Sequence, residues 1–275
     1  MQEPTKTLNK ENGLFNLRPA VMEDLNAVVK VINDSGMDQM GKALTNSKEI
    51  AEDWKMASFD LVQSTRVAEL PDGHIAGYIE VWDIDAVPVK NWVWACVDPQ
   101  FEGIGIGTAL MDWADVRLQS AVERSPADAR VIYQSSANSA HEPSKRFFED
   151  RGMQFVRRFW HMMIEFDGPP PEPLWPDSIT ISSYAEIDDL RAIVAADDET
   201  FQDHWGYVEG ETFEEWFHWI EEDTKFDPSV CFLATANGAE GEEIVGVLMA
   251  RPEWEEDSTI SWIDELGVLR GWRNK

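Results

Sequence analysis

The sequence predicts an α+β protein built from two similar halves. A hairpin signal in each half places consecutive strands antiparallel, which does not fit a sheet of strictly alternating strands and helices. A proline-rich segment at residues 167–177 favours an extended connector and forbids helix. The order strand, helix, hairpin, strand occurs on both sides of it, which indicates an internal repeat.

These patterns divide the chain into four segments. At 275 residues the chain has the length of two ordinary domains. We expect an N-terminal tail at residues 1–13, a first domain at 14–167, a linker at 168–177 and a second domain at 178–275.

In the first half, a short strand is followed by a helix with acidic residues near its start. Two strands then flank a Pro-Asp-Gly turn, which is a hairpin signal, and a third strand follows. The predicted ranges are 14–17 for the strand, 22–33 for the helix, 66–70 and 74–81 for the hairpin, and 91–97 for the third strand.

The second half has the same order of elements, and its hairpin surrounds a glycine-containing loop. The predicted ranges are 179–182 for the strand, 186–197 for the helix, 231–236 and 244–250 for the hairpin, and 259–268 for the last strand.

The net charge of −29 is the most distinctive feature of the composition. Binding to a phosphate backbone or an anionic membrane depends on Lys and Arg, so we expect neither nucleic acid nor membrane as a partner. The charge is compatible with a cationic amine as substrate, although a solubilising or salt-adapted surface is the favoured explanation.

Other compositional features exclude further classes of protein. No apolar run is long enough to span a bilayer and the N-terminus has no signal-peptide core, so the cytoplasm is the expected location. Two cysteines cannot form a disulfide framework, and no His, Cys or carboxylate cluster has the spacing of a metal site. We therefore expect no metal.

Three alternating glycines, Gly103, Gly105 and Gly107, lie between the strand at 91–97 and a helical pattern at 109–118. Such a loop lets the backbone approach a ligand closely and directs N–H groups at an anion such as pyrophosphate. The spacing fits neither a P-loop, because no Lys precedes Thr108, nor the dinucleotide fingerprint. A tight turn without a ligand is the alternative.

The run from Val97 through Pro99, Glu102-Gly103 and Gly105-Ile106-Gly107 to Leu110 resembles motif A of the GCN5-related N-acetyltransferase (GNAT) family. Downstream, Asn138, a helix at 144–151, Gly152-Met153 and a strand at 155–166 are similar to the closing segment of that family. The resemblance covers residues 14–167.

The resemblance implies two GNAT-like domains, each a mixed, mostly antiparallel sheet flanked by helices, and acetyl-CoA as co-substrate. In this family an amine attacks the thioester directly at a divergence between two central strands. The implied cofactor-binding residues of the first half are Cys96, Val97, Glu102, Gly103, Ile104, Gly105, Ile106, Gly107, Thr108 and Asn138.

The first half departs from the family pattern at three positions. Glu102 replaces the usual Arg or Gln and brings a carboxylate near the expected pyrophosphate. Trp94 lies one residue before the strand segment where a Glu often serves as base. Phe148 occupies the position of the tyrosine that often protonates the leaving thiolate. These departures predict weakened or lost catalysis in this half.

The second half is similar to the first up to its last residues. When Val268 is aligned with Val97, Arg273 falls on Glu102 and Lys275 on Ile104, just before the expected glycines. We therefore expect the second domain to hold only the N-terminal portion of the fold, ending inside the cofactor-loop motif. Its implied cofactor-binding residues are Leu266, Val268, Arg273 and Lys275.

Glu265 lies at the position of a catalytic base, so the second half is the predicted catalytic half; the alternative is an ordinary solvent-facing strand residue. The stretch Phe201–Gly206 is similar to tandem GNAT proteins related to mycothiol synthase.

The resemblance implies an acetyl-CoA-dependent N-acetyltransferase acting on a small-molecule or peptide amine. A non-catalytic acyl-CoA-binding or scaffold protein that keeps the fold is the main alternative, and an acidic interaction module that binds no CoA is a third. If the second half ends at Lys275, its unpaired strand edge favours association of copies.

Overall fold

The computed structural model forms two compact units, Met1–Trp160 (unit 1) and His161–Lys275 (unit 2). The described residues are 13–56, 58–85, 87–187, 190–204, 207, 213, 216–217, 220, 226–238, 241–254 and 257–274.

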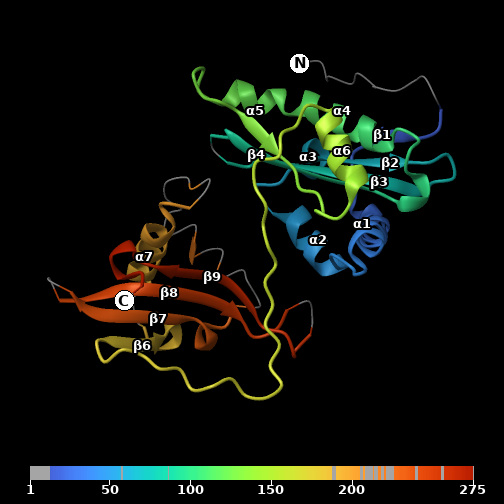
Figure 1. Cartoon of the computed structure of the whole chain (residues 1–275). Coiled ribbons are helices and arrows are strands. Elements are labelled where there is room, and N and C mark those ends of the chain that lie inside the picture. Colours follow the sequence, from blue (N-terminus) through green and yellow to red (C-terminus); the bar gives the residue numbers. More distant parts are fainter. Residues whose placement is uncertain are drawn as a thin grey trace. The chain divides into compact units, whose positions relative to one another are not determined.

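Unit 1 contains a five-stranded sheet whose strands follow one another in chain order (Figure 1). Neighbouring strands are antiparallel except the last pair, which is parallel. The strands are β1 (Asn16–Arg18), β2 (Thr65–Glu69), β3 (Ile75–Trp82), β4 (Lys90–Val97) and β5 (Ile132–Gln134).

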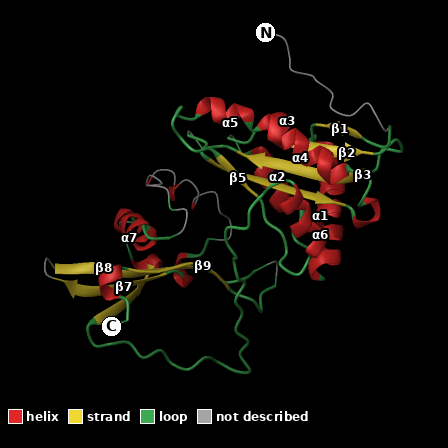
Figure 2. Cartoon of the chain, turned by 45° about the horizontal axis from the view of Figure 1, so that its top comes forward, coloured by secondary structure: helices red, strands yellow, loops and turns green. Residues whose placement is uncertain are grey.

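Helices cover both faces of this sheet, and each face has its own core (Figures 1 and 2). One face packs against α1 (Leu25–Met40) and α2 (Ser47–Lys55), the other against α4 (Ile106–Arg117) and α5 (Gln119–Arg124). The remaining helices are short: η1 (Met22–Asp24), α3 (Leu61–Ser64), η2 (Pro99–Phe101) and α6 (Glu142–Asp150).

Because β3 is covered on both faces, its residues are buried almost throughout. Gly77 in this strand permits the close approach of α4, since a Cβ atom there would lie 2.6 Å from Cγ2 of Ile106. The first turn of α4 therefore packs directly on the centre of the sheet.

Unit 2 repeats the antiparallel part of this design with four strands in chain order. The strands are β6 (Ile179–Ser183), β7 (Phe232–Gly238), β8 (Gly241–Arg251) and β9 (Trp262–Val268). The helix α7 (Arg191–Phe201) packs on β9, where a Cβ atom on Gly267 would lie 2.1 Å from Oγ1 of Thr200. Unit 2 also contains the 3₁₀ helices η3 (Tyr184–Glu186), η4 (Pro228–Val230) and η5 (Arg270–Trp272), and the described residues 213, 216–217 and 220 are helical.

The predicted α+β class and the repeated order of elements are confirmed, with two corrections to individual elements. The helix expected at 186–197 begins only at Arg191, after the 3₁₀ turn η3. The strand expected at 155–166 is absent: residues 154–178, all described, contain no helix or strand. A strand needs a neighbouring edge, and β5 with its three residues offers little of one.

Candidate active site

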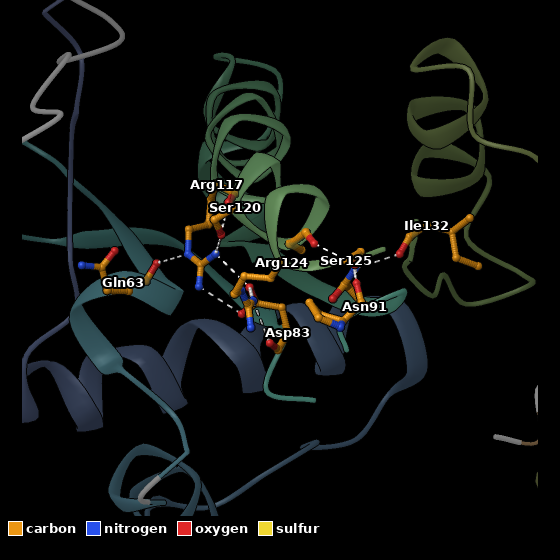
Figure 3. A network of polar contacts seen from close by, with 10 residues as sticks. Gln63, Asp83, Asn91, Arg117, Ser120, Arg124, Ser125 and Ile132 are labelled. Carbon is orange, nitrogen blue, oxygen red and sulfur yellow. Dashed lines mark hydrogen bonds and ion pairs between the residues drawn. The ribbon is translucent and has the colours of Figure 1, made fainter. Parts of the chain in front are cut away.

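The site is built around the divergence of β4 and β5. The two strands are in register only from Lys90 opposite Ile132 to Trp92 opposite Gln134, whereas β4 continues for five residues to Val97. The side chain of Asn91 ties the strands together before they part, because its Nδ2 donates to the carbonyl of Ile132 at 3.1 Å (Figure 3). Beyond Trp92, this edge of β4 has no strand pairing in the described part of the chain, and we call this unpaired edge the opening.

Backbone hydrogen bonds determine which residues of β4 face the opening. On the β3 side, the Asp98 N–H donates to the Ala76 carbonyl at 2.9 Å; on the β5 side, the Ile132 N–H donates to the Val89 carbonyl at 2.9 Å. Successive residues of a strand turn their backbone N–H and C=O groups to opposite sides. Since Val89 bonds toward β5 and Asp98 toward β3, the odd-numbered residues of β4 direct their backbone groups toward β5. Beyond the last pair with β5, the backbone groups directed into the opening are those of Val93, Ala95 and Val97.

The glycine loop continues directly from β4 and ends in the first turn of α4. Gly103 and Gly105 have φ values of 75° and 92°, in the left-handed region that favours glycine. A Cβ atom on either residue would meet nothing within 4 Å, so the space beside them is open. Gly105 is the N-cap of α4 and no side chain caps the helix. The first N–H groups of α4, those of Ile106 to Thr108, are therefore available to an anion.

The predicted cofactor-binding residues from Cys96 to Thr108 differ in exposure, with Val97 and Gly107 intermediate. Glu102, Gly103, Ile104, Gly105 and Thr108 are exposed at the loop. Cys96 and Ile106 are buried in the cores of opposite faces of the sheet, and burial raises the pKa of the Cys96 thiol far above its ordinary value. Only the backbone of these two residues can take part in a cofactor site.

The side chain of Asn138 makes hydrogen bonds within unit 1. Its Nδ2 donates to the carbonyl of Gln39 at the end of α1 (3.0 Å), and its Oδ1 accepts from the N–H of Ala140 (2.9 Å). These bonds hold the segment between β5 and α6 against α1. Its predicted contact with the cofactor stays a prediction.

A buried carboxylate that the sequence analysis did not select lies on the α1/α2 face of the sheet. Glu80 of β3 is 8% exposed and accepts a hydrogen bond at each oxygen, from the Tyr78 hydroxyl (2.8 Å) and from Trp82 Nε1 (2.9 Å). Tyr78 in turn accepts from Trp54 Nε1 at 2.9 Å. A glutamate within the apolar stretch Gly77–Trp82 was the signal in the sequence.

Burial raises the pKa of Glu80 above its ordinary value, although the bonds from Trp82 and Tyr78 oppose the shift. The charge of Asp53 on α2 adds to the increase. Asp53 itself is partly buried beside Glu49 and Glu52, and burial together with these charges raises its pKa to about 6. A raised pKa suits a group that accepts a proton near neutral pH.

Phe148, at the position of the family tyrosine, packs with Phe147 in the core beneath α4, with the ring centroids 5.7 Å apart. It has no hydroxyl with which to protonate a leaving group.

Asp83, which follows β3, anchors the far end of α4 (Figure 3). Its carboxylate is nearly buried and binds Arg117, the last residue of α4, through two bonds of 2.9 and 3.0 Å. Arg124 at the end of α5 makes an ion pair with the same carboxylate. This network fixes the helix whose other end forms the glycine loop.

In unit 2, Glu265 is half-buried on β9 opposite Met249. It lies close to Tyr184, whose pKa is raised mainly by burial and further by the charges of Cys231, Asp197 and Glu265. Within the described residues, β9 has no strand on its other edge, so unit 2 shows no counterpart of the β4–β5 divergence.

Arg273 is engaged within unit 2. It makes a 2.9 Å ion pair with Asp203 and donates to the carbonyls of Thr200 and Val268. Arg270 binds the same carboxylate, and the two guanidinium groups hold the pKa of Asp203 well below its usual range. Leu266 and Val268 have exposed side chains, and Lys275 lies outside the described residues. The cofactor roles predicted for these residues stay predictions.

The described residues were expected to hold neither a metal site nor a membrane-spanning segment. In the described part of the chain, no three His, Cys, Asp or Glu side chains gather as a metal site would require. No described helix has the length and apolar character needed to cross a bilayer.

The chain is similar to members of one known protein family. The sequence model of the family described as "Acetyltransferase (GNAT) family" matches residues 38–153 of this chain. A crystal structure of a GCN5-related N-acetyltransferase from Sphaerobacter thermophilus is 30% identical with a TM-score of 0.80, and the match covers 94% of this chain and 78% of that chain. A match of this extent spans both units.

A second structure contains the glucosamine N-acetyltransferase region of a fungal multi-domain GH3 β-N-acetylglucosaminidase. It is 16% identical with a TM-score of 0.58, and the match covers 99% of this chain and 34% of that chain, a likeness of fold alone. No protein of curated function matches the sequence.

Proposed function

The chain belongs to the family of GCN5-related N-acetyltransferases, and from this premise we propose that it transfers the acetyl group of acetyl-CoA to an amine. The observation that carries the proposal is the divergence of β4 from β5 beside an uncapped helix N-terminus. Acetyl-CoA supplies the activated acyl group when it is bound. The chain supplies the binding groups and the path for the protons.

The residues of unit 1 fit the two ends of such a ligand. The N–H groups from Ile106 to Thr108 suit the pyrophosphate, because they belong to a helix N-terminus that no side chain caps. The backbone groups of Val93, Ala95 and Val97 suit the amide-containing arm, which can pair with a free strand edge. Glu102 is the one unfavourable group, since its exposed carboxylate adds negative charge at the loop.

Phe148 alters the release of the product. Without a hydroxyl at this position, the thiolate of CoA takes its proton from the attacking nitrogen or from water. A slower release of the thiol follows, and this half remains competent in principle because attack of a neutral amine on the thioester does not require the acid.

Two carboxylates are candidates for the base, one in each unit. Glu265 is the candidate predicted from the sequence. It lies near Tyr184, to which Asp197 is also close, and this supports an ionisable cluster in unit 2. Glu80 is the candidate that lies in the unit with the diverging strands. The close relationship to mycothiol synthase-like tandem enzymes stays a prediction.

The test is amine-dependent thiol release from acetyl-CoA, with the acetylated product identified by mass spectrometry. We expect release with at least one primary amine and a loss of turnover when the base is replaced. Glu265→Gln has Glu253→Gln as its matched control, because Glu253 is exposed in the same unit. Unchanged turnover in Glu265→Gln at every pH would remove Glu265 from the reaction.

A non-catalytic acyl-CoA-binding protein is the second candidate function, favoured by Phe148 and Glu102. Binding of acetyl-CoA without any amine-dependent thiol release would support it over the transferase.

A further inference from the structure

A cavity of about 510 Å³ lies on the α1/α2 face of β3 and β4. Three tryptophans line it, Trp82 on β3 and Trp92 and Trp94 on β4, and we call them the tryptophan cage. The other lining residues are Glu80, Ile84, Asp85 and Lys90. A cavity of this size accommodates a small organic molecule.

Strand register explains why these side chains meet. Glu80 is opposite Trp94, and Trp82 is opposite Trp92. Within each strand the two residues are two positions apart, so all four side chains lie on the same face of the sheet. Trp82 is held in place by a tilted ring contact with Phe59, with 4.5 Å between the centroids, and by its bond to Glu80. Trp92 is 40% exposed, so it stands at the mouth of the cavity.

The cavity lies beside the place where the thioester is expected. Trp92 belongs to the last residue pair before β5 diverges, and Trp94 follows it along β4. A molecule in the cage is therefore next to the opening into which the backbone of Val93 and Ala95 points.

The electrostatics of the cavity favour a cation. Tryptophan faces attract cations through their quadrupole, and the attraction increases when the site is desolvated. Glu80 and Asp85 carry negative charge against the single positive charge of Lys90, and Asp53 adds a further carboxylate near Glu80. Three tryptophans beside a buried carboxylate therefore suit an ammonium group.

We propose that this cavity is the acceptor site, that it selects an aliphatic amine protonated at neutral pH, and that Glu80 is its counter-charge and proton acceptor. The inference rests on the proposed acetyl transfer. The ammonium group loses a proton to the Glu80 carboxylate, and the freed nitrogen lone pair attacks the thioester carbonyl carbon. The C–S bond breaks, the second nitrogen proton reaches the thiolate directly or through water, and Glu80 returns its proton to solvent.

The binding test uses choline and its carbon isostere 3,3-dimethylbutan-1-ol, which differ in charge and hardly in shape. Neither has a reactive amine, so binding to the full chain is measured by calorimetry without turnover. We expect choline to bind at least about ten-fold more tightly than the isostere, as cation–aromatic attraction and a counter-charge require. Glu80→Gln and Trp92→Leu should abolish this preference.

Two substitutions away from the cavity serve as matched controls: Glu123→Gln on the exposed side of α5 and Trp175→Leu in the exposed linker. Both should leave the preference for choline unchanged. Trp92 is an exposed residue, so Trp92→Leu should leave the core intact. A change in choline binding by this variant is therefore not caused by unfolding.

The outcome is separable from that of the proposed function. Equal binding of the two probes, no binding of choline, or a preference that survives Glu80→Gln would overturn the inference, whatever acetyl-CoA does. Failure of acetyl-CoA to bind would overturn the proposed function, and the choline measurement would still report on the cage.

Discussion

Glu80 and Trp94 are paired in register across β3 and β4, so a buried carboxylate lies opposite an aromatic ring at the point where β5 leaves the sheet. Trp94 lies close to the strand position where relatives often carry a glutamate. In this chain the carboxylate on the same face comes from the neighbouring strand. Unit 1 therefore has both an unpaired edge of β4 and a buried acidic group on the neighbouring strand.

The pH dependence of turnover should reveal Glu80. Because burial raises its pKa above the ordinary glutamate value of 4.5, the base form is lost as the pH falls through that raised pKa. We expect kcat/KM to fall on the acid side with a midpoint above 4.5. Glu80→Gln should lower kcat by about 10²-fold or more and remove this acid limb. An acid limb unchanged in the variant would contradict the role of Glu80.

Glu102→Gln should strengthen the binding of acetyl-CoA. The carboxylate is exposed at the glycine loop, so its removal relieves repulsion of an anionic ligand across solvent, a gain of about two- to five-fold in affinity. Salt screens this repulsion, and the difference between wild type and variant should shrink as ionic strength rises. Titrations at low and high salt check both statements, and an affinity unchanged at low salt would place the pyrophosphate elsewhere.

Asp83→Asn should destabilise unit 1. The substitution leaves Arg117 and Arg124 without their nearly buried counter-charge, at a cost of about 2–4 kcal/mol in the free energy of unfolding. Asp112→Asn is the matched control, because the 54% exposed Asp112 pairs with Arg151 at the surface and should contribute less than about 1 kcal/mol. Chemical denaturation measures the free energy of unfolding of both variants. Equal decreases in the two variants would contradict the anchoring role of the Asp83 network.

Asp53→Asn should stabilise the protein at neutral pH. The folded-state pKa of about 6 lies above the ordinary value of 3.8, so the folded state holds the proton more tightly. The favourable contribution of protonated Asp53 to the free energy of unfolding is fully present below pH 3.8 and is lost as the pH rises through about 6. Since Asp53 is only partly buried, we expect a gain of about 1–2 kcal/mol above pH 7 and none near pH 4. A pH-independent difference would contradict the shift.

Local signals in the sequence predicted most of the fold. The Pro-Asp-Gly turn predicted the hairpin of β2 and β3, and the three glycines predicted the loop that leads into α4. The strand expected at 155–166 was wrong because an apolar run becomes a strand only when another edge pairs with it. That requirement is not visible in the run itself.

The cavity lined by the tryptophan cage could not be predicted in the same way. Trp82, Trp92 and Glu80 were not identified from the sequence as site residues, and Trp94 was noted only as a departure from the family pattern. These residues belong to two strands whose register sets which side chains share a face. The roles of Asn138 and Arg273 depend on long-range partners, Gln39 and Asp203, that no local pattern names.

The most direct measurement is a calorimetric titration of the chain with acetyl-CoA, comparing wild type with Gly105→Asp and Gly105→Asn. Both variants place a similar side chain at the left-handed N-cap of α4, and only one adds a negative charge. We predict one site per chain in the wild type, weakened about ten-fold more by Asp than by Asn. No binding, or binding that Asp and Asn weaken equally, would contradict a cofactor site at this loop.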